Sequence, residues 1–204
     1  MERACHTMTQ DDKTYTDVSS EIPDADLARQ AQAGERAAFA ALYRRYLPRV
    51  YRYFYVRTGA VQPAEDLTSQ TFMAALESLP RYRERGMFAA WLFAIASRRY
   101  ADACRAQAAV PPQVVNDACV PPDAWDPPDP APLPETALVH AERMAALAQA
   151  LRALSPGRAQ AVALHFFGGL THKETARAMG RSGIAVKSLI NRALRDLRER
   201  LDNG

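Results

Sequence analysis

The chain has 204 residues, of which 48% are hydrophobic and 24% charged, and its formal net charge is +3. This length fits one large or two small domains, and the composition is that of an ordinary globular protein with a core. The small net charge alone does not indicate a nucleic-acid partner.

Several classes of protein are excluded by motifs that the chain lacks. Its three cysteines form no CxxC pair, which excludes a disulfide framework and a common zinc-finger spacing. The longest apolar stretch, residues 87–96, has about half the ~20 residues of a membrane helix, and no signal peptide is present. We therefore expect a cytoplasmic protein with reduced thiols and no membrane insertion.

Charged residues divide the chain into four segments. Residues 25–105 carry 13 basic and 7 acidic side chains, and residues 137–204 carry 11 and 5. Residues 106–136 have five acidic and no basic side chains and 9 of the 14 prolines, so they are expected to be an extended linker. Residues 1–24 are polar and acidic and are expected to be a disordered tail. These boundaries predict two small helical domains joined by a proline-rich linker.

Helical periodicity accounts for most of residues 25–105. The first expected helix has an apolar face formed by Phe39, Leu42, Tyr43, Tyr46 and Val50. The other faces of this helix carry Arg44, Arg45, Arg49 and Arg52. These arginines form either a solvated surface or a functional one, and the pattern favours neither.

A second helix is expected to begin at Pro63, because proline and the acidic residues after it suit a helix N-terminus. Its apolar side includes Phe72 and Leu76. A largely polar ridge on another side consists of Asp66, Gln70, Met73 and Glu77. This ridge predicts either a docking face or plain solvent-exposed surface.

The third helix, within residues 86–105, carries Trp91 on a tight apolar stripe, where a core position is expected. Its end is basic, with Arg98, Arg99 and Arg105 around Asp102. Upstream, arginines 81, 83 and 85 alternate with Tyr82, a mixture that suits single-stranded nucleic acid because bases stack on rings and phosphates meet arginine.

The most specific pattern lies in the C-terminal half. Thr171 followed by Glu174 is a capping box for a short helix, which Gly180 ends, and Ser182 caps the next helix after about three residues. This is a helix-turn-helix pattern, and the alternative is a helical hairpin with a solvated basic face. The expected fold is all-α, with a DNA-binding unit favoured at the C-terminus. The second helix carries a polar face with Lys187, Ser188, Asn191, Arg192 and Arg195. In the major groove asparagine suits adenine and arginine suits guanine.

Both halves resemble one family. The pattern L-T-x-x-E-x-A-x-x-M-G followed by V-K-S-x-x-x-R-A-L-x-x-L-R-E resembles region 4 of bacterial sigma factors. The segments DLTSQTFMAALESL and FAAWLFAIASRRYADACR resemble regions 2.2 to 2.4. The short linker leaves no room for a folded region 3, an arrangement similar to the extracytoplasmic-function (ECF) group of the sigma-seventy family.

The resemblance implies a function without catalytic residues, metal or cofactor. Such a factor binds core RNA polymerase, directs it to promoter DNA and helps to melt it. Residues 25–105 would be region 2 and residues 137–204 region 4. An anti-sigma factor is a further partner that the family suggests.

The resemblance also assigns roles to residues. Asp66, Gln70 and Phe72 would bind the polymerase core. The minus-ten element and its melting would involve Arg83, Arg98, Arg99, Asp102 and Arg105. The recognition helix, through Lys187, Ser188, Asn191, Arg192 and Arg195, would read the minus-thirty-five element.

Four departures from the family pattern bear on promoter choice. Arg98 stands where asparagine is frequent, Leu189 replaces a frequent arginine, and Thr175 replaces a usual isoleucine. The residues that lead into the recognition helix, S-G-I-A at 182–185, differ from the usual S-x-G-T.

Two other functions compete with this interpretation. A helix-turn-helix regulator that acts without polymerase would carry a ligand pocket or dimer interface in its N-terminal half. A nucleic-acid enzyme would carry a catalytic motif, and we find no paired carboxylates, GxxxxGK(S/T) loop or HExxH motif.

Overall fold

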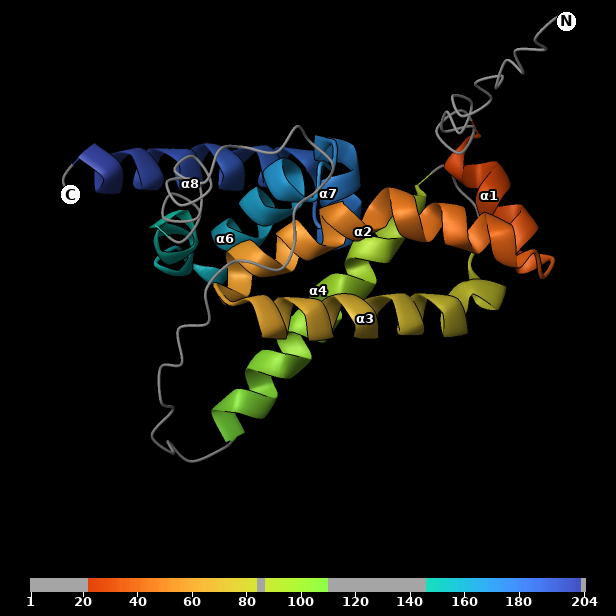
Figure 1. The fold of residues 1–204 in the computed structure, drawn as a ribbon. Helices are drawn as coiled ribbons and strands as arrows, with labels where there is room; N and C mark the ends of the chain where they lie inside the picture. Colours follow the sequence, from red (N-terminus) through yellow and green to blue (C-terminus); the bar gives the residue numbers. More distant parts are fainter. Residues whose placement is uncertain (1–21, 84–86, 110–145, 203–204) are drawn as a thin grey trace, which may run out of the picture.

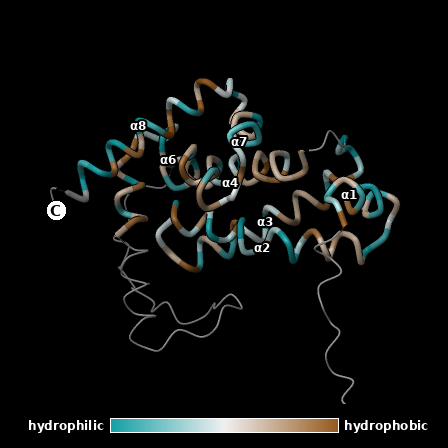
Figure 2. Tube along the Cα trace, turned by 90° about the horizontal axis from the view of Figure 1, so that it is seen from above, coloured by the Kyte–Doolittle hydropathy of each residue, from teal (hydrophilic) through white to brown (hydrophobic). Residues whose placement is uncertain are grey.

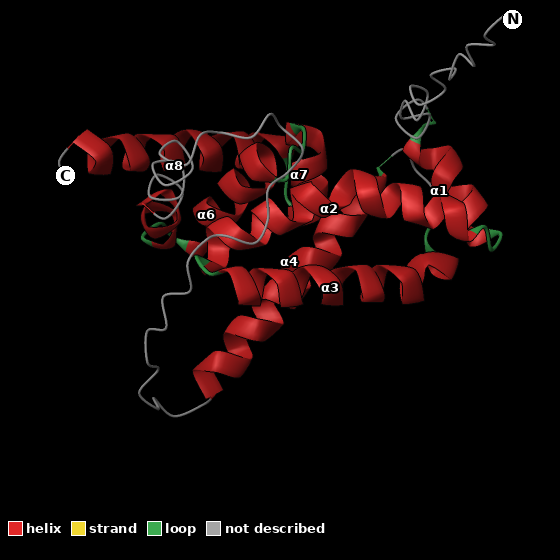
Figure 3. Cartoon of the chain, viewed as in Figure 1, coloured by secondary structure: helices red, strands yellow, loops and turns green. Residues whose placement is uncertain are grey.

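The computed structural model describes residues 22–83, 87–109 and 146–202, and the regular structure in these ranges is helical (Figures 1 and 3). The N-terminal half contains α1 (Asp24–Gln32), α2 (Arg36–Thr58), α3 (Val61–Ser78), the short 3-10 turn η2 (Leu79–Arg81) and α4 (Phe88–Ala109). In the C-terminal half residues 146–152 are helical, followed by α6 (Pro156–Val162), the π-helical turn η3 (Ala163–Phe167), α7 (His172–Met179) and α8 (Gly183–Asp202). The expected all-α fold is confirmed.

The N-terminal half is built around α2, which packs on α3 along one side and on α1 near its start (Figure 1). Most of its predicted apolar face is buried: Leu42, Tyr46 and Val50 are at most 2% exposed, and Phe39 is half-buried. Tyr43, which the pattern places on the same face, is 39% exposed. Gly59 ends the helix with φ of 73°, a left-handed conformation that favours glycine.

Some element boundaries differ from the predicted ones. Residues 22–24, which were expected to belong to the tail, are part of the described fold: α1 begins at Asp24, whose carboxylate accepts hydrogen bonds from the Arg45 guanidinium and the Tyr46 hydroxyl. Burial, together with that hydrogen bond, raises the pKa of Tyr46. Helix α3 begins at Val61, so Pro63 lies inside its first turn.

Helix α4 continues to Ala109, past the expected linker boundary at residue 106, since its last residues are rich in alanine and contain no proline. The expected tail before Ile22 and the acidic linker from residue 110 onward lie outside the described residues.

The two halves pack against each other. Leu151, Leu154, Leu164 and Leu170 belong to the same hydrophobic cluster as the buried residues of α2 and α4. Helix α7 lies against α4, and η3 lies against α2. Figure 1 shows α6 and α7 between α8 and the N-terminal half. The sequence predicts two domains but gives no sign that they share a core, because the contacting residues are far apart in the chain.

Candidate functional site

The helix-turn-helix is held by the caps that the sequence predicts. The Thr171 hydroxyl accepts the Glu174 amide at 3.2 Å, and the Glu174 carboxylate accepts the Thr171 amide at 2.8 Å. Gly180 ends α7 with φ of 63°. The Ser182 hydroxyl accepts the Ala185 amide at 3.2 Å in the first turn of α8. The capping box, the glycine stop and the serine cap are therefore confirmed, and they fix the short turn between α7 and α8.

A small second core joins α7 to α8. Ala161, Ala176, Val186 and Ile190 are buried together, and Leu189 packs against them. Leu189 therefore has a packing role at the position where the family often has arginine.

The outer face of α8 carries the predicted DNA-reading residues. Lys187, Asn191, Arg192 and Arg195 are exposed, and Ser188 is half-buried beside them. On the inner side, Asp196 pairs with Arg158 of α6, so this carboxylate is neutralised by the scaffold. Along α8 hydrophilic and hydrophobic residues alternate (Figure 2). The helix thus presents a basic outer face whose cations make no ion pair with any other described residue.

The residues predicted for the minus-ten element fall into two groups. Arg98, Asp102 and Arg105 are exposed near the C-terminal end of α4, and Arg99 beside them is half-buried. Asp102 pairs with Arg105, three residues along the helix, and both side chains are more than half exposed. Arg83 lies apart from this group, before the start of α4.

Arg83 lines a pocket of about 340 Å³ together with Arg81, Tyr82, Met87 and Trp91. The Tyr82 and Trp91 rings are 4.6 Å apart, centroid to centroid. Trp91 was expected in the core, but it is half-buried at the edge of the core, because the helical stripe places it beside this pocket. Arg177 of α7 also lines the pocket, so the C-terminal half contributes to its wall.

The predicted docking ridge lies on the outside of α3. Asp66, Gln70 and Glu77 are exposed, and Met73 is 64% exposed. Phe72 is not on this surface: it is 7% exposed and packs on Tyr43 of α2 at 4.6 Å, centroid to centroid. Phe72 therefore cannot form part of the exposed ridge, because it lies on the apolar side of α3 that faces α2.

Leu76, which the sequence places on the apolar side of α3, is 53% exposed. Periodicity alone could not identify it as a surface residue. We therefore define the docking ridge by Asp66, Gln70, Met73, Leu76 and Glu77, a surface that combines acidic and apolar side chains.

A junction of polar contacts ties the halves together. Arg49 of α2 donates from Nε to the Gly168 carbonyl at 2.8 Å and from Nη2 to the Gly169 carbonyl at 2.9 Å. Arg152 donates to the Thr58 carbonyl, at the end of α2, at 3.0 Å. Sequence reasoning missed Arg49 because nothing near it in the chain signals its partners.

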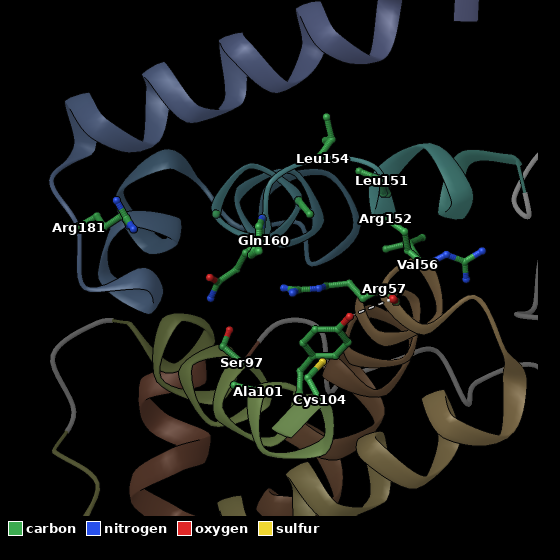
Figure 4. A pocket seen from close by; sticks show the side chains of 14 residues that line it. Val56, Arg57, Ser97, Ala101, Cys104, Leu151, Arg152, Leu154, Gln160 and Arg181 are labelled. Atoms are coloured by element: carbon green, nitrogen blue, oxygen red, sulfur yellow. Dashed lines mark hydrogen bonds between the residues drawn. The ribbon is translucent and has the colours of Figure 1, made fainter. Parts of the chain in front are cut away.

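Beside these contacts the two halves leave a cavity of about 590 Å³ between α2, α4 and α6. Arg57, Ser97 and Gln160 point toward its centre, while Arg181 and Arg152 lie at opposite sides (Figure 4). The Tyr100 hydroxyl donates to the Arg57 carbonyl at 3.2 Å, and the Arg57 guanidinium lies 3.9 Å from the Tyr100 ring centroid. The cavity therefore lies beside the hydrophobic cluster that the two halves share.

Neither a membrane span nor a metal cluster is found in the ranges that the structure describes. No helix there is both long and apolar enough to cross a bilayer. The same ranges hold no group of three or more histidine, cysteine, aspartate or glutamate side chains placed to share a metal ion.

Comparison with known proteins relates each half to a described region. Residues 42–110 match Sigma-70 region 2, and residues 144–197 match Sigma-70, region 4. BldN of Streptomyces coelicolor, an ECF RNA polymerase sigma factor, is 39% identical over 176 residues, which cover 84% of this chain and 63% of BldN. SigD of Mycobacterium tuberculosis, also an ECF sigma factor, is 31% identical over 180 residues, covering 84% of this chain and 81% of SigD.

Two solved structures are similar to this chain in fold. CnrH in complex with the cytosolic domain of CnrY matches with a TM-score of 0.64 at 26% identity, over 88% of this chain and 97% of that one. RpoE, in complex with the anti-sigma factor NepR from Bartonella quintana, matches with a TM-score of 0.59 at 22% identity, over 80% and 96% of the two chains. The second match shows similarity of fold.

In the described residues, the all-α fold and a helix-turn-helix with an exposed basic face define a DNA-binding protein of two helical parts. The similarity to SigD over most of both chains, together with the two matched regions, identifies its family. The chain belongs to the ECF RNA polymerase sigma factors. It spans less than two thirds of the length of BldN.

Proposed function

We propose that this protein binds core RNA polymerase and directs it to promoters, with residues 25–105 acting as region 2 and residues 137–204 as region 4. One observation carries the proposal: a single chain presents a recognition helix with an exposed basic face and, on its other half, an exposed acidic and apolar ridge. A DNA-binding unit alone would account for the first surface and leave the second unexplained.

The recognition helix α8 would read the minus-thirty-five element in the major groove. Asn191 offers an amide that can bond adenine in two places, and Arg192 offers a guanidinium that can do the same with guanine. Lys187 and Arg195 flank them on the exposed face and supply phosphate contacts, and Ser188 lies close enough to the surface to reach a base or phosphate.

The minus-ten element would meet α4 and the segment before it. Arg98, Arg99 and Arg105 supply positive charge, and Asp102 holds Arg105 in place through their ion pair. The pocket of Arg83, Tyr82 and Trp91 combines cations with aromatic rings, which is suitable for a base taken out of the stack during melting.

The docking ridge would bind the polymerase core. Met73 and Leu76 supply exposed apolar area, and Asp66 and Glu77 supply negative charge that a basic polymerase surface would complement. Phe72 would support the ridge from beneath by fixing α3 against α2.

Binding both promoter elements at once requires the two halves to separate. The two elements are named by their positions relative to the transcription start, so they lie about 25 base pairs apart. This separation is about 85 Å of B-form DNA. We call the arrangement in which the two halves pack together the closed arrangement. In it α7 contacts both α4 and α8, so α4 and α8 are too close together to reach both elements. The sequence between the two halves has 36 residues, 110–145, and a chain of that length spans at most about 130 Å, which permits the required separation.

Within this proposal the chain itself carries out no catalysis and needs no cofactor, since polymerase performs the chemistry. Transcription places the factor in the cytoplasm. An anti-sigma factor is a further expected partner, because it could act by holding the two halves together.

The test is a reconstituted assay with the purified chain, bacterial core RNA polymerase and a library of genomic promoter fragments. We expect transcripts from defined start sites only when the chain is present. Sequence-specific DNA binding by the chain with no affinity for core would instead establish the stand-alone regulator. A match between the start sites and one shared pair of promoter elements would complete the assignment.

A further inference from the structure

Ile184 is the most exposed of the large apolar side chains in the described part of the chain. It is 87% exposed, whereas Val186 and Ile190 on the same helix are 0% and 3% exposed. The described residues leave Ile184 uncovered, so its side chain contributes little to their packing. The Ile184 side chain is therefore available to contact a ligand.

The position of Ile184 on α8 relates it to the DNA-reading face. At about 100° per residue, Ile184 lies within about 40° of Ser188, Asn191 and Arg195 around the helix axis. Lys187 lies within about 60° on the other side. Ile184 is thus the N-terminal member of the same exposed face, one turn before the polar residues.

The first turn of α8 holds Ile184 firmly. The Ser182 cap fixes the Ala185 amide on the next residue, and a β-branched side chain has few allowed rotamers on a helix. In helix-turn-helix proteins the N-terminal residues of the recognition helix contact base edges. A stiff apolar group is therefore placed where base contacts are made.

We propose that Ile184 recognises the C5-methyl group of a thymine in the minus-thirty-five element. Isoleucine can neither donate nor accept a hydrogen bond, and the thymine methyl is the apolar group that a base pair presents in the major groove. The contact would add to the polar reading by Asn191 and Arg192. This inference rests on the proposed promoter-binding function, in which α8 enters the major groove.

The test uses the full chain bound to core RNA polymerase. Duplexes with a randomised minus-thirty-five element are first selected with the wild-type holoenzyme, which identifies the preferred thymines. Each of these thymines is then replaced singly by deoxyuridine, which removes the methyl group and leaves every hydrogen-bonding group unchanged. Affinities are compared for wild type, Ile184→Ala, Ile184→Val and Leu194→Ala.

We expect one thymine at which deoxyuridine weakens wild-type binding by about fourfold, the factor expected for one buried methyl group. Ile184→Ala should weaken binding of the unmodified duplex and lose its sensitivity to deoxyuridine at that position. Ile184→Val should keep most of this sensitivity. Leu194 is 41% exposed and lies about 80° from Ile184 around α8 and almost three turns further along, so Leu194→Ala should keep the wild-type sensitivity to deoxyuridine.

Three outcomes would overturn the inference. The wild type could be insensitive to deoxyuridine at every position, or Ile184→Ala could keep the wild-type profile. Ile184→Ala could also weaken all duplexes equally, modified and unmodified, which would indicate a general role in the fold. Failure of the wild-type holoenzyme to select any sequence would contradict the proposed function itself, and the inference with it.

Discussion

Arg49 and Gly168 lie 119 residues apart in the sequence, and the Arg49 Nε donates to the Gly168 carbonyl at 2.8 Å. The second bond, to the Gly169 carbonyl, uses Nη2 of the same guanidinium. Both carbonyls follow η3, where the end of a helical segment leaves unpaired oxygens and partial negative charge. The guanidinium lies 4.8 Å from the Tyr46 ring centroid, so one cation links α2, its own aromatic neighbour and the C-terminal half.

Replacing Arg49 should therefore open the molecule. In Arg49→Ala the two carbonyls lose a charged donor, and we expect closure to weaken by about 1–2 kcal/mol, or about five- to thirtyfold. Small-angle X-ray scattering of the free chain should record a larger radius of gyration. Arg52→Ala is the control, because Arg52 is exposed on the same helix and bonds only the Pro48 carbonyl within it, at 3.3 Å. Superimposable scattering from Arg49→Ala and wild type would contradict this role.

Gly168 tests the same junction from the other side. An added Cβ would lie 2.7 Å from the Leu164 carbonyl oxygen and 2.9 Å from a ring carbon of Phe93. Gly168→Ala should therefore destabilise the closed protein by about 1–3 kcal/mol, measured by urea unfolding. Gly157→Ala is the matched control, because a Cβ there meets nothing within 4 Å and favours α6. Equal stability of the two variants would show that the junction tolerates the extra methyl group.

Features of the fold could be predicted from the sequence where they depend on interactions between residues close together in the chain. The helix-turn-helix was predictable because Thr171, Glu174 and Ser182 cap helices through bonds that span three residues. The partners of Arg49 were not, since they come from the opposite end of the chain. For Phe72 and Leu76, one turn apart, periodicity gave the same expectation, yet Phe72 is 7% exposed and Leu76 is 53% exposed. That difference depends on how α3 packs in the tertiary structure, which the spacing of apolar residues does not show.

Arg192 is the recognition-helix residue whose removal should affect base choice most. We expect Arg192→Ala to weaken promoter binding by about 1–3 kcal/mol and to relax preference at one base pair, as for a guanidinium bonded twice to guanine. A residue that touched only phosphate would weaken all sequences alike and lower the salt dependence by about one unit. Binding of the holoenzyme to matched and single-base-changed duplexes at fixed salt separates these outcomes. Arg200→Ala is the control, because Arg200 lies about 180° from Asn191 around α8 and contacts the Ala153 carbonyl at 3.4 Å.

The docking ridge makes the corresponding prediction for polymerase. Asp66 is exposed, and no ion pair joins it to another described residue, so Asp66→Arg reverses a surface charge and leaves the core of α3 unchanged. If the ridge meets a basic surface on the polymerase core, the variant should bind core at least tenfold more weakly, because like charges then face each other at the interface.

Competition between the variant and labelled wild type for a limiting amount of core measures this loss. Glu35→Arg, an exposed charge reversal just before α2 and not on α3, should compete as well as wild type. Met73→Ala adds a second test, since it removes exposed apolar area from the ridge without changing its charge. Equal competition by Asp66→Arg and Glu35→Arg would move the polymerase contact away from α3, whereas a loss in both ridge variants would tie charge and apolar area to one binding surface.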